Sequence, residues 1–230
     1  MAEHTAGRGT PSIAAPRRTR AVAVPIGTLA VASACWIVSL RQMSGMDQGP
    51  ATELGTVASF LALWMPMMAA MMLPAALPAV ARFATDNQRA TAGVEFVAAY
   101  VAVWTAVGIA AFALYRAHGA VAAGTLTIAA GLYELSPVKR ECRRRCREHV
   151  RSGVEFGTYC VGSSVGLMVA LLALGVMSVT WTAVIAAVVF VQKLLPPRGA
   201  LDATVALGLV GLGTLVALVP AHVPGLSLPM

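Results

Sequence analysis

Seven apolar stretches, separated by short polar or basic segments, make up most of the chain. Each is close to the roughly 17–25 residues that a helix needs to cross the hydrocarbon core of a bilayer. The pattern therefore predicts an all-α, polytopic transmembrane helical bundle of about seven spans. The expected spans are Ala21–Leu40, Leu54–Val80, Ala92–Leu114, Ala120–Leu135, Thr158–Met177, Val179–Leu195 and Leu201–Pro220.

Three of these spans leave alternatives open. The second carries Pro66, Pro74 and Pro78, so we expect it to be kinked or partly re-entrant. The fifth and sixth are joined by almost nothing, and one broken hairpin is the alternative to two spans. In the first, Ala32–Ala34 resembles a signal-peptide cleavage site, but the apolar run continues to Leu40, which favours an uncleaved anchor.

Composition supports a membrane protein. Apolar residues make up 58% of the 230 positions and charged residues 12%, about half of the ~25% charged residues of a soluble domain. The high apolar content excludes a disordered chain, and four cysteines are too few for a disulfide-rich secreted scaffold.

The basic residues predict the orientation. Lys and Arg give a net charge of +7, and with the N-terminus inside, fifteen of the seventeen lie on one side of the membrane. Because Lys and Arg stay in cytoplasmic loops, we expect the N-terminus and the 137–157 loop in the cytoplasm and the C-terminus outside. Residues 1–20 are expected to be a disordered basic cytoplasmic tail, and residues 21–220 a single transmembrane domain.

This distribution also predicts location and partners. We expect a multi-pass protein of the bacterial inner (plasma) membrane. The partners are the lipid bilayer and anionic lipids at the 137–157 loop. Nucleic acid is not expected, because the clustering of basic residues between apolar runs already explains the charge.

The second span contains an unusual run of methionines. Residues 65–72 hold five of the chain's eleven methionines, and helical periodicity places Met67, Met68, Met71 and Met72 on one face. Thioethers are soft, neutral ligands that suit Cu(I). The alternative is that flexible methionines fill an irregular, proline-kinked interface. Met168, in the fifth span, lies at a similar depth in the membrane.

The cysteines supply further soft ligands near the cytoplasmic side. Cys142 and Cys146 are spaced i, i+4, which places both thiols on one helix face, and Cys160 opens the fifth span. A reducing cytoplasm disfavours a disulfide, so a metal or redox role is the functional option. Residues 143–145 are all arginine, and nearby cations favour the thiolate but repel a metal cation.

Few other residues indicate chemistry. Glu95, Glu134 and Lys193 fall near the ends of their spans, and we interpret them as interfacial side chains. The sequence has no Ser-His-Asp order, HExxH, P-loop or GxGxxG motif. We therefore do not expect an enzyme.

Four segments together carry a family resemblance. They are Trp64-x-x-Met67-x-x-Ala70-Met71-Met72-x-Pro74; Tyr133-x-x-Ser136-Pro137-x-Lys139-Arg140-x-Cys142-x-x-x-Cys146; Gly157-x-Tyr159-Cys160-x-Gly162 with Leu167-Met168; and Gly175-Val176-Met177 with Lys193-Leu194-Leu195-Pro196. Across roughly residues 30–200, the chain resembles the bacterial predicted metal-binding integral membrane proteins, a domain of unknown function. The resemblance implies a membrane protein that binds metal.

The chain also departs from that family at several positions. The resemblance implies two cysteines where Ser163 and Ser164 stand, and a tryptophan at Val165 and a histidine at Phe156. It also implies an acidic residue at position 192 and a glutamine at position 134, where this chain has Gln192 and Glu134. The chain therefore resembles a divergent member with an altered set of ligands.

The expected function is binding or membrane passage of a soft metal ion, with Cu(I) favoured and a copper ion the only cofactor. A membrane or copper protein is the expected partner. The alternative is a non-catalytic membrane subunit or assembly factor with a degenerate metal site. The candidate metal ligands are Met67, Met68, Met71, Met72, Cys142, Cys146, Cys160 and Met168.

Overall fold

The described part of the chain is entirely helical. The computed structural model describes residues 15–44, 55–87, 89, 91–115, 118–148, 151–195 and 199–219, and within these ranges it contains eight helices and no strand. The predicted all-α fold is confirmed. The helices are α1 Ala15–Met43, α2 Val57–Asn87, α3 Ala92–Leu114, α4 Ala120–Glu134, α5 Pro137–Arg145, α6 Gly153–Leu174, α7 Val179–Leu194 and α8 Gly199–Leu218.

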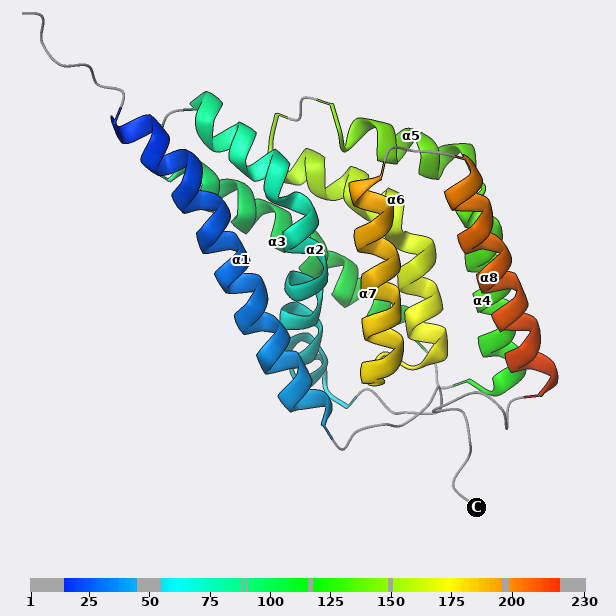
Figure 1. The fold of residues 1–230 in the computed structure, drawn as a ribbon. Coiled ribbons are helices and arrows are strands. Elements are labelled where there is room, and N and C mark those ends of the chain that lie inside the picture. Colours follow the sequence, from blue (N-terminus) through cyan, green and yellow to red (C-terminus); the bar gives the residue numbers. More distant parts are fainter. Residues whose placement is uncertain are drawn as a thin grey trace, which may run out of the picture.

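Each of the seven expected spans corresponds to one helix, and successive long helices run in opposite directions (Figure 1). α1 begins at Ala15, six residues before the expected start, and residues 1–14 of the expected tail lie outside the described residues. The helix ends that flank the loops expected in the cytoplasm gather at one end of the bundle, where α5 lies across them (Figure 1). We call this the α5 end.

The seven helices differ in whether they are long enough to cross a membrane. Five of them, α1, α2, α3, α6 and α8, are long and apolar enough to cross a membrane. α4 is long enough to cross a membrane only if it is counted as one segment with α5, and a bend of 61° separates these two helices. α7 has 16 residues, about 24 Å at 1.5 Å per residue against a hydrocarbon core of about 30 Å. The described helices thus include five to six spans by length, against about seven expected.

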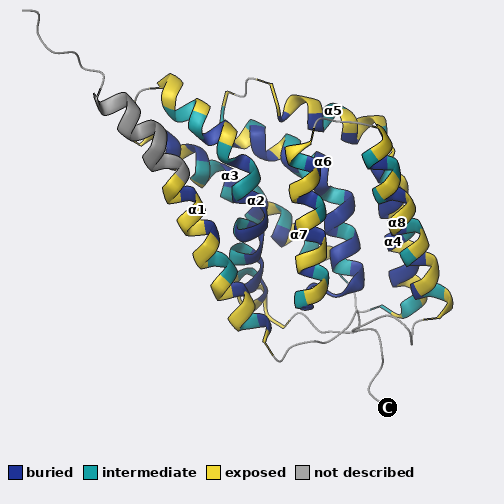
Figure 2. Ribbon diagram, viewed as in Figure 1, coloured by how far each residue is buried: buried dark blue, intermediate teal, exposed yellow. Residues whose placement is uncertain are grey.

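α2 packs among the other helices, and its middle, residues 63–73, is mostly buried, while residues at both of its ends are exposed. It continues as one helix from Val57 to Asn87 through all three of its prolines, so the expected re-entrant break is wrong. Its neighbours are α1, α3 and α7. Ala70 and Leu73, on the side away from the methionines, are as buried as Met67. A helix that is apolar all round belongs in a core, and Figure 2 shows the buried centre of the bundle.

A sharp turn joins α6 and α7, which are two separate helices. Of the two, only α6 is long enough to cross a membrane by itself, so two spans and one broken hairpin both stay predictions. α6 ends at Leu174, and Gly175 follows with φ 120°. Glycine adopts this conformation without strain because it has no Cβ.

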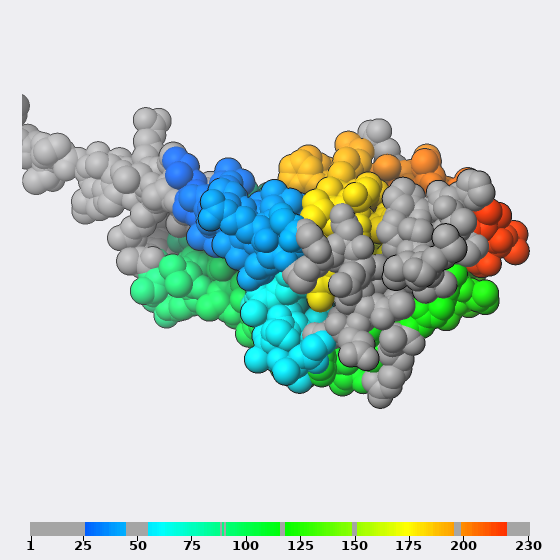
Figure 3. All heavy atoms as spheres, turned by 90° about the horizontal axis from the view of Figure 1, so that it is seen from below, coloured from blue at the N-terminus to red at the C-terminus, as the bar shows by residue number. Residues whose placement is uncertain are grey.

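α4 and α8 form a close pair at one side of the molecule. A Cβ added to Gly124 would lie 2.5 Å from the carbonyl oxygen of Gly213, and one added to Gly213 would lie 2.6 Å from that of Gly124. Small residues allow such close approach between membrane helices. Seen from the end opposite α5, α1 (blue) and the end of α8 (red) lie at opposite sides, with the start of α7 (yellow) between them (Figure 3).

α5 is a short basic helix outside the apolar spans. Five of its nine residues are Lys or Arg. The Ser136 side chain accepts a hydrogen bond from the Lys139 backbone N–H, and Pro137 occupies the first turn, which are the residue types preferred at a helix N-terminus. This start turns the chain across the end of the bundle and packs α5 on α6.

Candidate functional site

A fully buried ion pair lies at the α5 end. Lys139 of α5 pairs with Glu134 of α4, and both side chains are 0% exposed. The Gln192 amide of α7 joins them: its nitrogen donates to Glu134 Oε2 at 2.7 Å, and its oxygen accepts from Lys139 Nζ at 2.9 Å. The interpretation of Glu134 as an interfacial carboxylate is therefore wrong, because three elements close over it. Glu95, in contrast, is exposed and pairs with Arg89.

A second buried pair fastens α5 to α7 and α8. Arg143 pairs with Asp202 of α8 and donates to the Gln192 backbone oxygen at 2.5 Å. Arg147 donates to the carbonyl oxygens of Lys193 and Leu194 at 3.0 and 3.1 Å. The last carbonyls of a helix have no partner within it, and cations stabilise them. These two arginines therefore hold the C-terminal end of α7 in place.

Two cysteines meet beside Lys193. The Lys193 ammonium lies 3.4 Å from Cys160 Sγ of α6 and 4.0 Å from Cys146 Sγ at the end of α5. It also donates to Ser163 Oγ at 2.5 Å, and the Tyr100 hydroxyl lies 3.3 Å from Cys160 Sγ. We call these five residues the thiol–lysine cluster. The half-buried Lys193 is thus an internal contact of the bundle rather than an interfacial side chain.

Cys142 lies one helical turn before Cys146. Its Sγ packs against Gly162 of α6, where an added Cβ would lie 2.6 Å from the sulfur. The predicted arrangement of both thiols on one helix face agrees with this packing, because both cysteines contact the α6 side of the bundle. All four cysteines of the chain are free thiols in the structure.

Burial decides the acidity of the α5 thiols. It raises the pKa of Cys146 to about 12, and burial followed by the charge of Glu141 raises the pKa of Cys142. The charge of Arg145 lowers the pKa of Cys142, as expected, but burial outweighs it, so the expected gain in thiolate is wrong for these two residues.

Three of the α5 arginines pair with carboxylates. Arg144 and Arg145 both donate to Glu141, and these hydrogen bonds lower the pKa of the Glu141 carboxyl to about 2. Arg143 pairs with Asp202. These carboxylates offset the charges of the three arginines.

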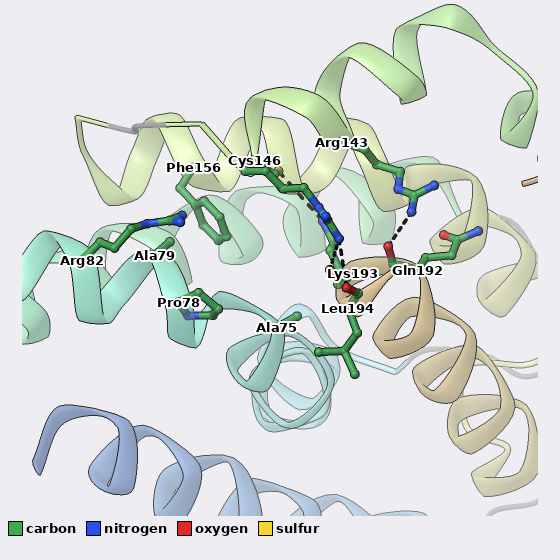
Figure 4. Close-up of a pocket in the computed structure, with 11 residues that line it drawn as sticks. Ala75, Pro78, Ala79, Arg82, Arg143, Cys146, Phe156, Gln192, Lys193 and Leu194 are labelled. Carbon is green, nitrogen blue, oxygen red and sulfur yellow. Dashed lines mark hydrogen bonds between the residues drawn. The ribbon is translucent and has the colours of Figure 1, made fainter. Parts of the chain in front are cut away.

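A cavity of about 340 Å³ opens beside the cluster at the α5 end. Figure 4 shows that α2, the end of α5 and the end of α7 contribute to its wall. Cys146 lines it, and Arg82, Arg143, Arg147 and Lys193 give it four cationic side chains. Among the residues that the structure describes, none that lines the cavity is acidic.

The methionines lie deeper in the same core. Met67, Met68, Met71 and Met72 are at most 3% exposed, and Met168 is 2% exposed. They belong to one hydrophobic cluster with Cys160 and Cys146. The Thr182 hydroxyl donates to Met67 Sδ at 3.9 Å.

The structure therefore brings two of the eight predicted ligands, Cys146 and Cys160, to one cation and leaves the methionines within the packed core. Within the described ranges, no three His, Cys, Asp or Glu side chains gather closely enough to hold a metal ion.

Sequence reasoning missed the polar framework around these thiols. The sequence pattern gives no sign that Lys139, Arg143 and Asp202 form buried ion pairs, and it makes Glu134 and Lys193 look interfacial. One signal was present: positions 134 and 192 depart reciprocally from the resembled family, which implies glutamine and an acid where this chain has Glu134 and Gln192. The two side chains are hydrogen-bonded, so the exchange keeps one carboxylate and one amide beside Lys139.

Comparison with known protein families gives one match. Residues 61–216 match a family model described as PpoB2: Copper chaperone. This range includes α3 to α7, most of α2 and α8, and all eight predicted ligands. No curated protein and no solved structure matches the chain.

Proposed function

This chain belongs to the PpoB2 copper chaperone family, and from that membership we propose that it receives Cu(I) at the α5 end and hands it on within a membrane. The observation that carries the proposal is the shared position of Cys146 and Cys160 beside Lys193. We further propose that the membrane is the bacterial inner membrane, with the α5 end in the cytoplasm. The description of the family as a chaperone favours a non-catalytic role.

The charges of the thiol–lysine cluster suit a cuprous ion. Thiolates are soft ligands that select Cu(I), and they must lose their protons to bind it. A cuprous ion held by two thiolates carries one net negative charge. Lys193, which already contacts both sulfurs, supplies the matching positive charge. A buried charge needs such a partner because burial without one is costly.

The remaining ligand candidates extend this proposal into the core. Cys142 lies one turn from Cys146 and supplies a third thiol. Met67, Met68, Met71, Met72 and Met168 supply neutral thioethers that bind Cu(I) without losing a proton. Their burial, at most 3% exposed, would keep water away from a bound cuprous ion. In this proposal copper passes from the thiols to these methionines.

A second candidate function is a membrane assembly factor that binds no copper itself. Ser163 and Ser164 support it, because the resembled family implies cysteines there. Ser163 instead accepts a hydrogen bond from Lys193. In this alternative the cluster fastens α5, α6 and α7 and has no metal role.

Copper titration of the purified protein separates the two candidates. Under reducing conditions the protein should bind Cu(I), and Cys146→Ser and Cys160→Ser should each lower the affinity by at least tenfold, because serine lacks the soft donor atom. Cys35→Ser is the matched control, since Cys35 lies on α1 away from the cluster. Unchanged copper binding in both cluster variants, or none in the wild type, would contradict the proposal.

The same titration tests the buried methionines. Met71→Leu combined with Met72→Leu keeps the apolar volume nearly constant, and such exchanges cost less than about 1.5 kcal/mol each. The double variant should fold normally and lose the part of its copper capacity that the thiols do not provide. If the double variant binds as much copper as the wild type, Met71 and Met72 only fill the core and do not bind the metal.

A further inference from the structure

The cavity at the α5 end carries positive charge that the fold leaves uncompensated. Arg82 and Arg147 are exposed at its rim, and Lys193 reaches into it (Figure 4). Among the described residues, Arg82 makes no hydrogen bond or ion pair, and Arg147 contacts only backbone carbonyls of the α7 end. Arg143 is the exception, because Asp202 neutralises it.

This charge opposes the entry of a bare cuprous cation. Like charges repel, and a cavity lined by one sign of charge concentrates ions of the opposite sign. Cys146, which is 8% exposed, nevertheless lines the same cavity. A cationic pocket with a soft donor is suited to copper that arrives inside an anion.

The size and the lining of the cavity indicate which kind of anion it binds. The volume of about 340 Å³ lies at the small end of the range for pockets that hold small molecules. Guanidinium groups bind carboxylates through paired, charge-assisted hydrogen bonds. Arg82 and Arg147 come from different elements, so a ligand with two carboxylates could contact both walls.

Building on the proposed function, we propose that this cavity takes up copper as an anionic complex of Cu(I) with small, carboxylate-bearing thiols, and that Cys146 exchanges with one of those thiols. Arg82 and Arg147 hold the carboxylates of the complex. Lys193 lies beside the sulfur that receives the metal. Cys160, behind Lys193, is the second acceptor.

The exchange conserves atoms, charge and oxidation state. The Cys146 sulfur forms a bond to copper as the bond from copper to one carrier sulfur breaks, and the Cys146 proton moves to the departing thiolate, which leaves as a neutral thiol. Cys160 displaces the second carrier thiol in the same way. Copper remains Cu(I) throughout, and the complex keeps one net negative charge at its two sulfurs, beside Lys193.

Binding of a copper-free analogue tests the pocket directly. S-methylglutathione carries two carboxylates and a blocked sulfur, so it can occupy the cavity without reacting. Calorimetry on the full chain in zwitterionic nanodiscs should detect its binding, and Arg82→Gln should weaken that binding about tenfold, as expected for one lost charge-assisted hydrogen bond.

Arg140→Gln is the matched control. It removes the same charge from the same end of the molecule, but Arg140 is exposed on α5 and does not line the cavity. If the analogue binds equally weakly to both variants, overall charge alone explains the effect, and the proposal is overturned. The proposal is also overturned if the analogue does not bind and added phosphatidylglycerol binds through Arg82. The cavity would then be a site for a lipid headgroup.

Two copper donors distinguish a failure of this inference from a failure of the proposed function. The wild type should take copper from Cu(I)–glutathione faster than Arg82→Gln does, while both take it equally fast from the cationic Cu(I)–acetonitrile complex. If both proteins take copper equally fast from glutathione, only the carrier inference fails. If neither donor loads the wild type, the proposed copper function itself fails.

Discussion

At the scale of single residues, the α5 end depends on charges that have no contact with water. Lys139 and Glu134 are both 0% exposed and share the Gln192 amide. A buried charge is stable only with its partner, because desolvation penalises the isolated ion far more than the pair. The pair is therefore stable only while α4, α5 and α7 keep their positions around it.

Removing one member should destabilise the fold. Lys139→Met leaves the Glu134 carboxylate buried and unpaired, and we expect the loss of roughly 3–5 kcal/mol that accompanies a broken buried pair. The double variant with Glu134→Gln carries no buried charge there and should recover most of that loss. Thermal unfolding in detergent measures both, and a double variant no more stable than Lys139→Met would contradict the account.

At the scale of helices, glycines decide how closely two elements approach. Gly213 of α8 meets the backbone of Gly124 of α4, whereas nothing lies within 4 Å of a Cβ added to Gly211 or Gly208 of the same helix. Backbone cannot move aside as the end of a flexible side chain can. Among these three glycines of α8, only Gly213 is required by the close approach to α4, while Gly208 and Gly211 have space for a side chain.

This contrast gives a matched pair of variants. Gly213→Ala should lower stability and loosen α8, because the new methyl group would overlap the Gly124 carbonyl oxygen. Gly211→Ala should leave stability unchanged or raise it slightly, since alanine favours a helix by about 1 kcal/mol over glycine. Unfolding midpoints in detergent compare the two, and equal midpoints would show that the close contact has no energetic role.

At the scale of the whole molecule, the arrangement of the helices fits the orientation expected from the charges. One end of the bundle holds α5, the starts of α1, α3 and α8 and the ends of α2 and α7, and α8 finishes at the other end (Figure 1). Fifteen of the seventeen Lys and Arg belong to the segments expected at the first end. The bias in basic residues therefore predicts which end enters the cytoplasm.

Reporter fusions test this orientation. A reporter that is active only outside the cytoplasm should work at the C-terminus, and one that is active only inside should work in the α5–α6 connection. The physical reason is the cost of moving the arginine-rich segment across the bilayer. The reverse pattern at both sites would overturn the orientation, and agreement at one site only would overturn the number of crossings.

The sequence by itself determined the helices and the basic end of this protein. A run of about twenty apolar residues buries its backbone polar groups only as a helix, and this property belongs to each segment alone. The predicted all-helical fold and the position of the basic α5 segment follow from it. The i, i+4 spacing of Cys142 and Cys146 is likewise a local property, so it correctly placed both thiols toward one side of α5.

Only the tertiary structure decided which side chains meet. Lys193 contacts Cys160 and Cys146 from 33 and 47 residues away, and Glu134 contacts Gln192 from 58 residues away. Helix packing and the bend of 61° between α4 and α5 create these contacts. Hydropathy cannot distinguish a charge at the interface from one enclosed by neighbouring helices, because both occur at a helix end. That is why Glu134 and Lys193 looked interfacial in the sequence and are internal in the fold.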